Sequence, residues 1–413
     1  MQDKQHVGVI GGGIIGICAA ISLLDTGHRV TLIERDAPGQ ATSFGNAGII
    51  SPWSIIPQAM PGIWKQIPGM LLRPNGPAGV SMRQGPGYLP WLIRFLRESR
   101  LDRAQANSDA MQLLCGDAVT LYRELLRGTG HDDLIADAMY VHAFRDARNA
   151  DLSSLGYKMR RQKGADLERI DAADLRDLEP NLSHDFQAAI LIKGQARARD
   201  PGRLGTVLAN KIKALGGQIC RETVRDLTPV SGGWDVITNM GTHPFDKVVL
   251  AAGIWSAELL RRFNISLPLA AERGYHVSFG DADLHLNNSI MDTDAHAVAS
   301  SMDGGVRIAG VAEFTGIDAP PNPGRLRALK QIAQSMIPDL KHKTPDTWMG
   351  IRPSFPDSLP LIEECKDLPG LICAFGHSHY GLMMAPKTGR IVADIATGTP
   401  TNIDLSPFRA ARF

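Results

Sequence analysis

The sequence predicts a two-domain α/β protein, with a Rossmann-like dinucleotide-binding domain and an α+β domain built on an antiparallel sheet. Two observations predict the first domain: a glycine-rich turn follows the first apolar segment, and a second apolar segment ends in a carboxylate. A third predicts the other domain, because the middle of the chain mixes amphipathic helical stretches with short strand-like segments. The length of 413 residues, at about 150 residues per domain, fits two or three domains.

The first element is a strand expected over 6–10, which leads directly into the turn Gly11-Gly-Gly-Ile-Ile-Gly16 and then into a helix predicted over 17–26. In this G-x-G-x-x-G pattern Gly11 permits the tight turn, and Gly13 lets the backbone approach a pyrophosphate. Gly16 allows the helix to pack closely on the strand. An anion is expected at the helix N-terminus, where free N–H groups and the helix dipole favour negative charge.

A second strand is predicted over 29–33 and ends at Glu34. A carboxylate at this place accepts hydrogen bonds from an adenosine ribose, and this context supports a dinucleotide site better than the glycine spacing alone. The small-residue segment 41–52 and several following prolines exclude a regular crossover helix. We expect this segment to be a loop whose free N–H groups lie against a phosphate or a flat ring.

Composition and charge exclude several function classes. The 44 Lys and Arg residues balance 43 Asp and Glu residues, so no field of one sign attracts nucleic acid or an anionic membrane. Five cysteines without C-x-x-C spacing argue against a disulfide framework and a zinc site, and fit a reducing cytoplasm. The apolar stretch 7–24 is also compatible with a membrane anchor or signal peptide, but its four glycines favour the nucleotide-binding turn.

Six segments together resemble, in their order along the chain, the D-amino acid oxidase-like family of FAD-dependent oxidoreductases, and within it the bacterial D-amino acid dehydrogenases. The resemblance implies non-covalently bound FAD and oxidation of an amino acid at the carbon that bears nitrogen. It also implies a discontinuous FAD-binding domain of the GR2 type. The segments are 11–16, Glu34, the loop 41–48 with Thr42, Ser43, Asn46 and Gly48, then 248–256, 350–357 and 375–377.

The family pattern divides the chain between two interleaved domains. Residues 1–60, 197–268 and 345–413 are expected to form the FAD-binding domain, and residues 61–196 and 269–344 the substrate-binding domain. Local patterns agree with this division. Helices are predicted over 89–101, 108–127, 201–215 and 255–263, and strands over 139–144, 218–221, near 223–224, over 246–253, 269–279, 295–301 and 306–311, with a hairpin turn over 302–305.

Most of the predicted cofactor contacts come from turns at the ends of strands. The helix after His377 is expected to direct its N-terminus at flavin N1 and C2=O, where negative charge develops. Sarcosine oxidases tether flavin through a cysteine in the region where this chain has 350–352, so no covalent link is expected. The predicted FAD-binding residues are Gly11, Gly13, Ile14, Ile15, Gly16, Glu34, Arg35, Thr42, Ser43, Asn46, Ala47, Gly48, Val224, Ala252, Gly253, Trp255, His377, Gly381 and Leu382.

Arg352 is the first candidate for the substrate site. The family places a carboxylate-binding arginine in the matching G-x-R-P motif, and a planar guanidinium holds both carboxylate oxygens in a fixed orientation. The alternative is a structural arginine paired with an acid such as Asp357. Holding the carboxylate still is necessary because the Cα–H bond must point at the flavin.

Three further residues are weaker candidates for the substrate site. Some oxidases of the family carry a tyrosine on the substrate-domain sheet, but this chain has Val298 at the matching place. Tyr275 is an alternative phenol, and alternation along the strand directs His296 into the pocket. His379 is a candidate for a hydrogen bond to flavin or substrate. Each is also compatible with a purely structural role, and two histidines two residues apart do not predict a metal site.

The predicted function is FAD-dependent oxidative deamination of a D-amino acid, by hydride transfer from Cα to flavin N5. The imino acid is then hydrolysed to a 2-oxo acid and ammonia, with oxygen or a quinone as electron acceptor. One alternative is a secondary-amine oxidoreductase acting on D-proline, D-hydroxyproline or an N-methyl amino acid. Another is a flavin-binding assembly subunit without a substrate. The expected location is cytoplasmic, with at most peripheral contact with the inner membrane and no nucleic-acid partner.

Overall fold

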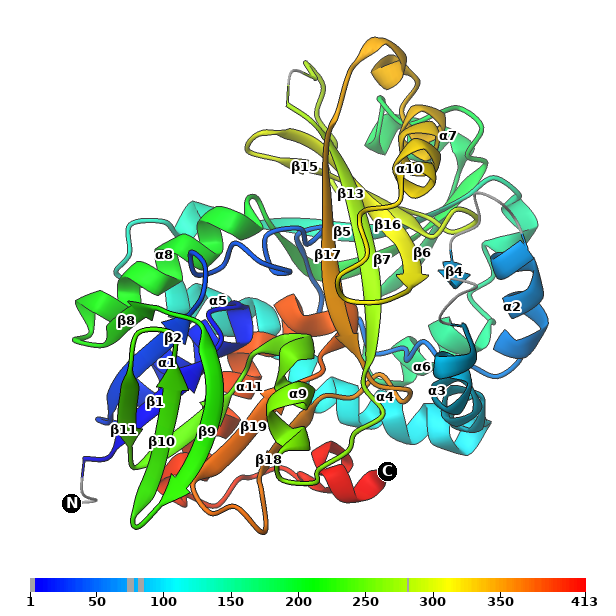
Figure 1. The fold of residues 1–413 in the computed structure, drawn as a ribbon. Coiled ribbons are helices and arrows are strands. Elements are labelled where there is room, and N and C mark those ends of the chain that lie inside the picture. Colours follow the sequence, from blue (N-terminus) through cyan, green and yellow to red (C-terminus); the bar gives the residue numbers. More distant parts are fainter. Residues whose placement is uncertain (1–3, 73–77, 81–84, 281) are drawn as a thin grey trace.

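The computed structural model describes residues 4–72, 78–80, 85–280 and 282–413. Their strands form a six-stranded, a three-stranded and a ten-stranded sheet. Figure 1 shows the first two sheets together at the end of the molecule that holds the N-terminus, and the ten-stranded sheet at the other end. The α/β fold with two dissimilar parts predicted from the sequence is confirmed.

The six-stranded sheet has the order β18-β19-β12-β1-β2-β8, in which only β18, at one edge, is antiparallel to its neighbour. Strand β1 pairs with both β2 and β12, so the glycine turn that follows Ile10 lies at the centre of the sheet. The strands are β1 (His6–Ile10), β2 (Arg29–Glu34), β8 (Gln218–Arg221), β12 (Lys247–Leu250), β18 (Leu361–Glu364) and β19 (Leu371–Phe375).

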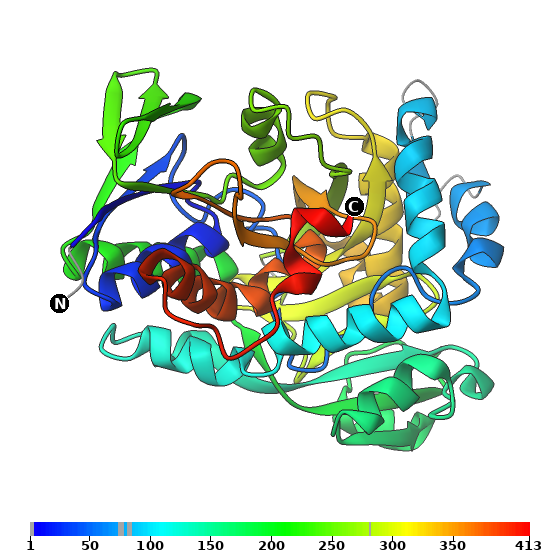
Figure 2. The ribbon, with the colours of Figure 1, turned by 90° about the horizontal axis from the view of Figure 1, so that it is seen from below.

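Both faces of this sheet are covered, because its central strands are apolar at almost every position. Val7 and Val9 pack toward helices, whereas Ile10 and Ile33 pack toward the three-stranded sheet. Figure 2 shows that sheet on one side and the helices on the other. The covering elements are α1 (Ile14–Asp25), α8 (Pro201–Ala214), α11 (Gly381–Thr397), and the strands β9 (Val224–Val230), β10 (Gly233–Thr238) and β11 (Thr242–Phe245).

Helix α11 crosses α1 closely because Gly389 has no side chain. A Cβ at Gly389 would lie 2.6 Å from the carbonyl oxygen of Cys18. Pro386, within α11, lacks the N–H that would bond the carbonyl of Leu382. The Tyr122 hydroxyl donates to that carbonyl instead, at 2.6 Å, and thereby ties another helix to α11.

The helices before residue 127 differ from the prediction of one long helix over 108–127. The chain forms α4 (Leu101–Cys115) and α5 (Ala118–Leu126), because Gly116 and Asp117 interrupt the helical pattern. Helix α3 spans Gly85–Glu98 rather than 89–101. Both α4 and α5 pack against the core beneath α1 and α11.

The ten-stranded sheet is mostly antiparallel, as predicted, with parallel pairs only between β14 and β5 and between β16 and β4. Its main order is β17-β13-β16-β15-β14-β5-β7-β3, with β4 beside β16 and β6 beside β7. The strands are β3 (Ile49–Ile50), β4 (Ala78–Val80), β5 (Ile135–Phe144), β6 (Leu167–Asp171), β7 (Ala188–Ala198), β13 (Ala270–Phe279), β14 (Ser289–Asp292), β15 (Ala297–Met302), β16 (Gly305–Phe314) and β17 (Asp346–Ser354).

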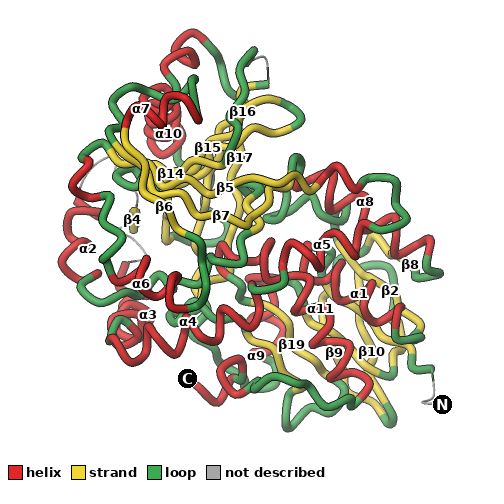
Figure 3. Tube along the Cα trace, turned by 180° about the vertical axis from the view of Figure 1, so that it is seen from behind, coloured by secondary structure: helices red, strands yellow, loops and turns green. Residues whose placement is uncertain are grey.

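Helices cover one face of this sheet and leave the other for a cavity. Figure 3 shows α7 and α10 beside the curled strands, and α10 packs on β13, β15 and β16 over an apolar core. Strands β3 and β17 join this sheet although 1–60 and 345–413 were assigned to the FAD-binding domain, and those boundaries stay a prediction. The remaining helices are α2 (Ile63–Leu72), α6 (Leu155–Gln162), α7 (Ala172–Leu178), α9 (Ser256–Arg261) and α10 (Pro323–Met336).

Candidate active site

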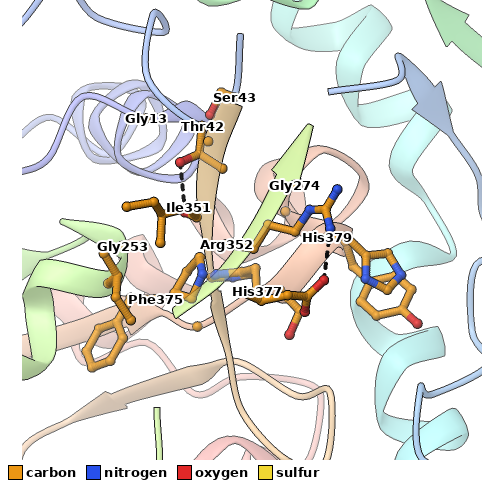
Figure 4. Close-up of a pocket in the computed structure, with 18 of the residues that line it drawn as sticks. Gly13, Thr42, Ser43, Gly253, Gly274, Ile351, Arg352, Phe375, His377 and His379 are labelled. Atoms are coloured by element: carbon orange, nitrogen blue, oxygen red, sulfur yellow. Dashed lines mark hydrogen bonds and ion pairs between the residues drawn. The ribbon is translucent and has the colours of Figure 1, made fainter. Parts of the chain in front are cut away.

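A cavity of about 1400 Å³ is lined by residues from both large sheets. One end lies at the turn between β1 and α1, and the other faces β13, β16 and β17. Figure 4 shows part of this lining. Of the residues predicted from the sequence to bind FAD, all except Gly16 and Gly48 line the cavity, as do Arg352, Tyr275, His296 and His379.

The glycines of the first turn have different structural roles. Gly11 has a φ of 104°, and a Cβ there would lie 2.5 Å from the carbonyl oxygen of Ala251. A Cβ at Gly16 would collide with the carbonyl oxygen of Gly11. Gly13, in contrast, has an ordinary φ of −68°, and only the Ser43 hydroxyl lies within 4 Å of a Cβ built there. The turn itself therefore requires Gly11 and Gly16, whereas Gly13 leaves open space in front of the helix.

Two side chains occupy the start of α1. The N–H of Ile14 donates to the Ser43 hydroxyl at 3.0 Å, and Ile15 lies in the same helical turn. The N–H of Gly12 donates to a carboxylate oxygen of Glu34 at 2.5 Å. Glu34 is thereby fixed at the end of β2 facing the cavity, where its remaining lone pairs are placed to accept from a ribose hydroxyl.

The nucleotide end of the cavity is closed by Arg35, whose guanidinium lies 3.8 Å from the ring centroid of Trp255. Val224 begins β9 on the same wall, and Ala252 and Gly253 follow β12. Gly253 has a φ of 59° and begins a single 3-10 turn, Gly253–Trp255, before the short helix α9. The helix predicted over 255–263 is therefore shorter than expected.

The loop 41–48 is held against the ten-stranded sheet. The Thr42 hydroxyl donates to the carbonyl of Ile351 at 2.9 Å (Figure 4). The Asn46 side chain accepts from the N–H of Gly48 at 2.8 Å, next to Ala47. Gly48 has a φ of 79°, and a Cβ there would lie 2.6 Å from the carbonyl oxygen of Ala198.

Sequence reasoning missed three residues that support this loop. Buried Arg307 donates from Nη1 to the carbonyls of Phe44 and Asn46, at 2.9 Å each. His276 contacts the carbonyl of Gly45 at 3.2 Å, and its ring stacks on Trp348 at 5.0 Å. All three come from strands of the ten-stranded sheet, and no spacing in the sequence connects them with the loop.

His377 lies just before α11 and is neutral in the folded protein. Burial lowers its pKa to about 3, and its Nε2 contacts the Thr388 hydroxyl at 3.0 Å. A 3-10 turn, Ser378–Tyr380, connects it to α11, and Gly381 and Leu382 in the first turn of α11 line the cavity. The N-terminus of α11 therefore faces the cavity, and its direction toward flavin N1 and C2=O stays a prediction.

Arg352 lies on β17 with its guanidinium partly exposed to the cavity. Its Nη1 donates to Glu272 at 2.8 Å, and Glu272 lies directly opposite on β13. A Cβ at Gly274 would collide with the guanidinium, so the absence of a side chain there makes its position possible (Figure 4). In the described part of the chain no side chain bonds Nη2 or Nε, which are free for a second carboxylate. Asp357, the acid named as an alternative partner, pairs with Arg412 instead.

Glu272 connects Arg352 to His379. Its second oxygen accepts from the Ser354 hydroxyl at 2.7 Å and lies 3.5 Å from the Gln58 amide, which contacts His379 Nδ1 at 3.0 Å. Burial by itself would raise the pKa of the Glu272 carboxyl, but Arg352, His379 and Ser354 hold it below its usual value. Glu272 is therefore an anion at neutral pH.

His379 is neutral, because burial lowers its pKa to about 4 although Glu272 acts in the opposite direction. Since the Gln58 amide nitrogen can only donate, His379 Nδ1 accepts and the proton resides on Nε2. His379 therefore presents an N–H donor within the substrate half of the cavity.

The hydroxyl of Tyr275 points away from the site. Adjacent Gly274 faces Arg352, and the Tyr275 hydroxyl donates to Glu313 at 2.5 Å in the core beneath α10. The side chain is 1% exposed, so Tyr275 reaches the cavity wall without offering its phenol. Alternation along β13 explains this direction, because Glu272 and Gly274 share the face that meets Arg352 and Tyr275 is on the opposite face.

His296 lies at the cavity wall before β15, with a φ of 52°, and Val298 follows on the strand. Burial lowers the His296 pKa, whereas Asp292 and Asp294 raise it. No hydrogen bond of the His296 ring to another described residue is found. His296 therefore remains a candidate for substrate contact.

The residues present fit a bound FAD. The glycine turn leaves room for a pyrophosphate before α1, Glu34 is placed for a ribose, and the N-terminus of α11 faces the opposite end of the cavity. The described residues contain no cluster of three or more His, Cys, Asp or Glu side chains suited to a metal ion. The five cysteines are free thiols.

Comparison with known proteins identifies the class to which this fold and site belong. Residues 6–395 match the family described as FAD dependent oxidoreductase, and the chain belongs to that family. It is an FAD-dependent oxidoreductase, and this membership favours an enzyme over the assembly-subunit alternative.

Two proteins similar in sequence and one similar in fold give a more specific comparison. The chain is 38% identical to a D-amino-acid oxidase of Bradyrhizobium diazoefficiens over the full length of both proteins. It is 28% identical to a D-amino acid dehydrogenase of Rhizobium rhizogenes, covering 99% of this chain and all of the relative. Its fold is similar to glycine oxidase from Geobacillus kaustophilus, with a TM-score of 0.76 and 23% identity over 99% of this chain and all of that chain.

Proposed function

We propose that this protein catalyses the oxidative deamination of a D-amino acid. The support is Arg352, a cation on the cavity wall whose guanidinium has one edge occupied by Glu272 and one edge free. The 38% identical relative is named for D-amino acids and aligns over its whole length. When bound, FAD supplies the two-electron acceptor for the hydride that leaves Cα.

Arg352 binds and orients the substrate carboxylate. The two free nitrogens of the guanidinium match the two oxygens of a carboxylate, and such paired charge-assisted hydrogen bonds fix direction as well as position. Glu272 and Gly274 hold the guanidinium in place, and a fixed carboxylate leaves Cα one preferred orientation in the cavity.

Other residues of the chain keep the site dry and neutral. His379 stays uncharged and donates from Nε2, so it does not compete with Arg352 for the carboxylate charge. The substrate amine must lose its proton at or after binding, and no side chain is required as an obligatory base. Trp91 and Phe314, whose ring centroids lie 5.2 Å apart, line the same end and exclude water.

The electron acceptor and the location stay predictions. Oxygen and a quinone are both compatible with the site, and the cytoplasmic location with at most peripheral inner-membrane contact is not tested by the structure. Within the described ranges, no helix is both long and apolar enough to cross a bilayer.

Substitution of Arg352 tests the proposal. Arg352→Met should retain FAD but lower kcat/KM for D-amino acids by about 10³-fold, because truncating one partner of a buried charge pair typically costs about 2–5 kcal/mol. Arg352→Lys should recover part of this loss. The matched control is Arg161→Met, an exposed arginine on α6, which should leave kcat/KM unchanged. Normal turnover by Arg352→Met would remove the carboxylate assignment.

A further inference from the structure

A second arginine, Arg160 on α6, also lines the cavity. Its Nε donates to the carbonyl of Trp53 at 3.0 Å, and its Nη1 contacts the carbonyl of Gly156 at 3.5 Å. No hydrogen bond from Nη2 to another described residue is found. Within the described ranges, no carboxylate lies within 4.0 Å of this guanidinium, so its charge is unpaired.

Other buried or half-buried arginines of the described chain either pair with a carboxylate or donate to backbone carbonyls. Arg352 pairs with Glu272, Arg145 with Asp292, and Arg412 with Asp357. Arg273, fully buried, instead donates to four backbone carbonyls, those of Gly316, Ile317, Ala319 and Pro320. Buried Arg307 also lacks a carboxylate and donates to the carbonyls of Phe44 and Asn46. Arg160 differs from Arg273 and Arg307 because it lines the cavity, where a ligand can supply the partner that a desolvated charge favours.

The environment of Arg160 is aromatic rather than acidic. Its guanidinium lies 5.6 Å from the ring centroid of Tyr157, and buried Tyr140 and Tyr380 are also close enough to act on its charge. Burial lowers the Arg160 pKa from its usual value, and the three phenols act in the opposite direction. Because arginine starts from so high a pKa, the group remains a cation at neutral pH.

Arg160 lies toward the substrate end of the cavity, not the nucleotide end. The Tyr380 ring, on which Arg160 acts, lies 3.9 Å from the ring of His379. His379 contacts Gln58, which reaches toward Glu272, the partner of Arg352. Tyr380, His379, Gln58 and Glu272 thus connect the surroundings of Arg160 with Arg352. Glu272 balances the charge of Arg352, whereas in the described structure no acid balances the charge of Arg160.

We propose that Arg160 binds a second anionic group of the substrate, so that the preferred substrates are D-amino acids whose side chain ends in a carboxylate. The proposal rests on the proposed function, in which Arg352 holds the α-carboxylate. An amino acid with a carboxylate at each end places one negative charge at each arginine, with Cα between them. The Nη2 group of Arg160 and its cavity-facing edge supply charge-assisted hydrogen bonds to the distal group.

Pairs of acids and isosteric amides provide the test. Anaerobic flavin reduction is followed with D-glutamate against D-glutamine, and with D-aspartate against D-asparagine. Of D-glutamate and D-aspartate, the acid with the higher kcat/KM should exceed its own amide by roughly a hundredfold in kcat/KM with the wild-type holoenzyme. The reason is that the amide leaves the Arg160 charge unpaired. Arg160→Gln should bring this ratio close to one by raising KM for the acid. Its rate with D-alanine and its flavin absorption spectrum should stay unchanged.

Two variants separate a binding role from a structural one. Arg160→Lys, which retains the cation, should keep part of the preference for acids. Arg161→Gln removes an exposed arginine from the same helix and should behave as the wild type. If Arg160→Gln does not fold, the lysine variant and the wild-type ratio still decide the question.

Three other results would each contradict the role proposed for Arg160. A wild type that oxidises neutral D-amino acids without any preference for acids overturns this proposal and leaves the proposed function standing. Loss or spectral change of bound FAD in Arg160→Gln, with the acid-to-amide ratio retained, assigns Arg160 to the cofactor and also overturns it. If no amino acid reduces the flavin, the proposed function fails, and this inference fails with it.

Discussion

The two ends of the cavity are built in different ways. At the nucleotide end, backbone groups of a short segment form the site, and Gly11 and Gly16 are needed because a Cβ would strike neighbouring carbonyls. At the substrate end, side chains from separate strands and helices meet, and buried charges hold them in place, as Glu272 holds Arg352. The nucleotide end therefore depends on glycines that lack a Cβ, whereas the substrate end depends on the pairing of opposite charges.

The largest predicted effect comes from filling the nucleotide end. Gly16→Ala should yield protein without bound FAD and lower the free energy of unfolding by about 3 kcal/mol or more, because the new Cβ collides with the Gly11 carbonyl. Gly13→Ala should fold normally, since its Cβ meets only the Ser43 hydroxyl at 3.6 Å, yet lose affinity for FAD where the pyrophosphate approaches. Flavin absorbance and urea unfolding measure the two effects separately.

The matched control is Gly87→Ala on α3, where nothing lies within 4 Å of the added Cβ. It should retain FAD and unfold at the same urea concentration as the wild type or a slightly higher one. Tight FAD binding by Gly13→Ala would show that the backbone does not approach the pyrophosphate at this residue.

A smaller effect is predicted for the charge balance at the substrate end. Glu272→Gln leaves Arg352 as an unpaired buried cation and should lower the free energy of unfolding by about 3–5 kcal/mol at pH 7. The same variant should bind the substrate carboxylate more tightly, because Arg352 is no longer neutralised. Asp137→Asn removes an exposed partner of Arg123 and should change stability by less than about 1 kcal/mol. Equal losses in the two variants would contradict the role given to Glu272.

The smallest effect is a pH dependence from the buried histidines. The pKa of His379 is lowered to about 4 and that of His377 to about 3, whereas an unfolded histidine titrates near 6.5. The unfolded chain therefore binds protons first as the pH falls below 6.5, and stability is lost in that direction. Between pH 7.5 and pH 5 each histidine should contribute a loss of about 2 kcal/mol.

Urea unfolding of the wild type and of His379→Asn at both pH values measures this contribution. The variant should show a drop in stability that is smaller by about 2 kcal/mol. A drop of the same size in both proteins would mean that His379 is protonated or accessible in the folded state.

Local patterns sufficed to predict the nucleotide end. The strands over 6–10 and 218–221 have the predicted bounds, and helix α8 ends one residue before the predicted position. Apolar runs bounded by glycine determine these elements within a few residues of chain. The split of 108–127 into two helices was missed because Gly116 interrupts a continuous apolar stripe without a proline to mark the break.

The substrate end depends on register, which one sequence does not determine. Glu272 meets Arg352 because β13 and β17 pair with those residues opposite each other, 80 positions apart. Alternation places Tyr275 on the face of β13 opposite Glu272, but only the pairing with β17 shows which of the two faces meets Arg352. Arg160 belongs to a short helix with a charged pattern, and only its position in the fold shows that it faces a cavity.

The most direct measurement is anaerobic flavin reduction by matched enantiomers. Purified holoenzyme is mixed with D- and L-alanine, D- and L-glutamate, and D- and L-proline, and the loss of flavin absorbance is followed. The proposed function predicts that D-enantiomers bleach the flavin and that L-enantiomers do not, and the role proposed for Arg160 predicts that D-glutamate bleaches it faster than D-alanine. Bleaching by proline alone would favour a secondary-amine oxidoreductase, and bleaching by L-enantiomers or by none of the six would contradict the assignment to D-amino acids.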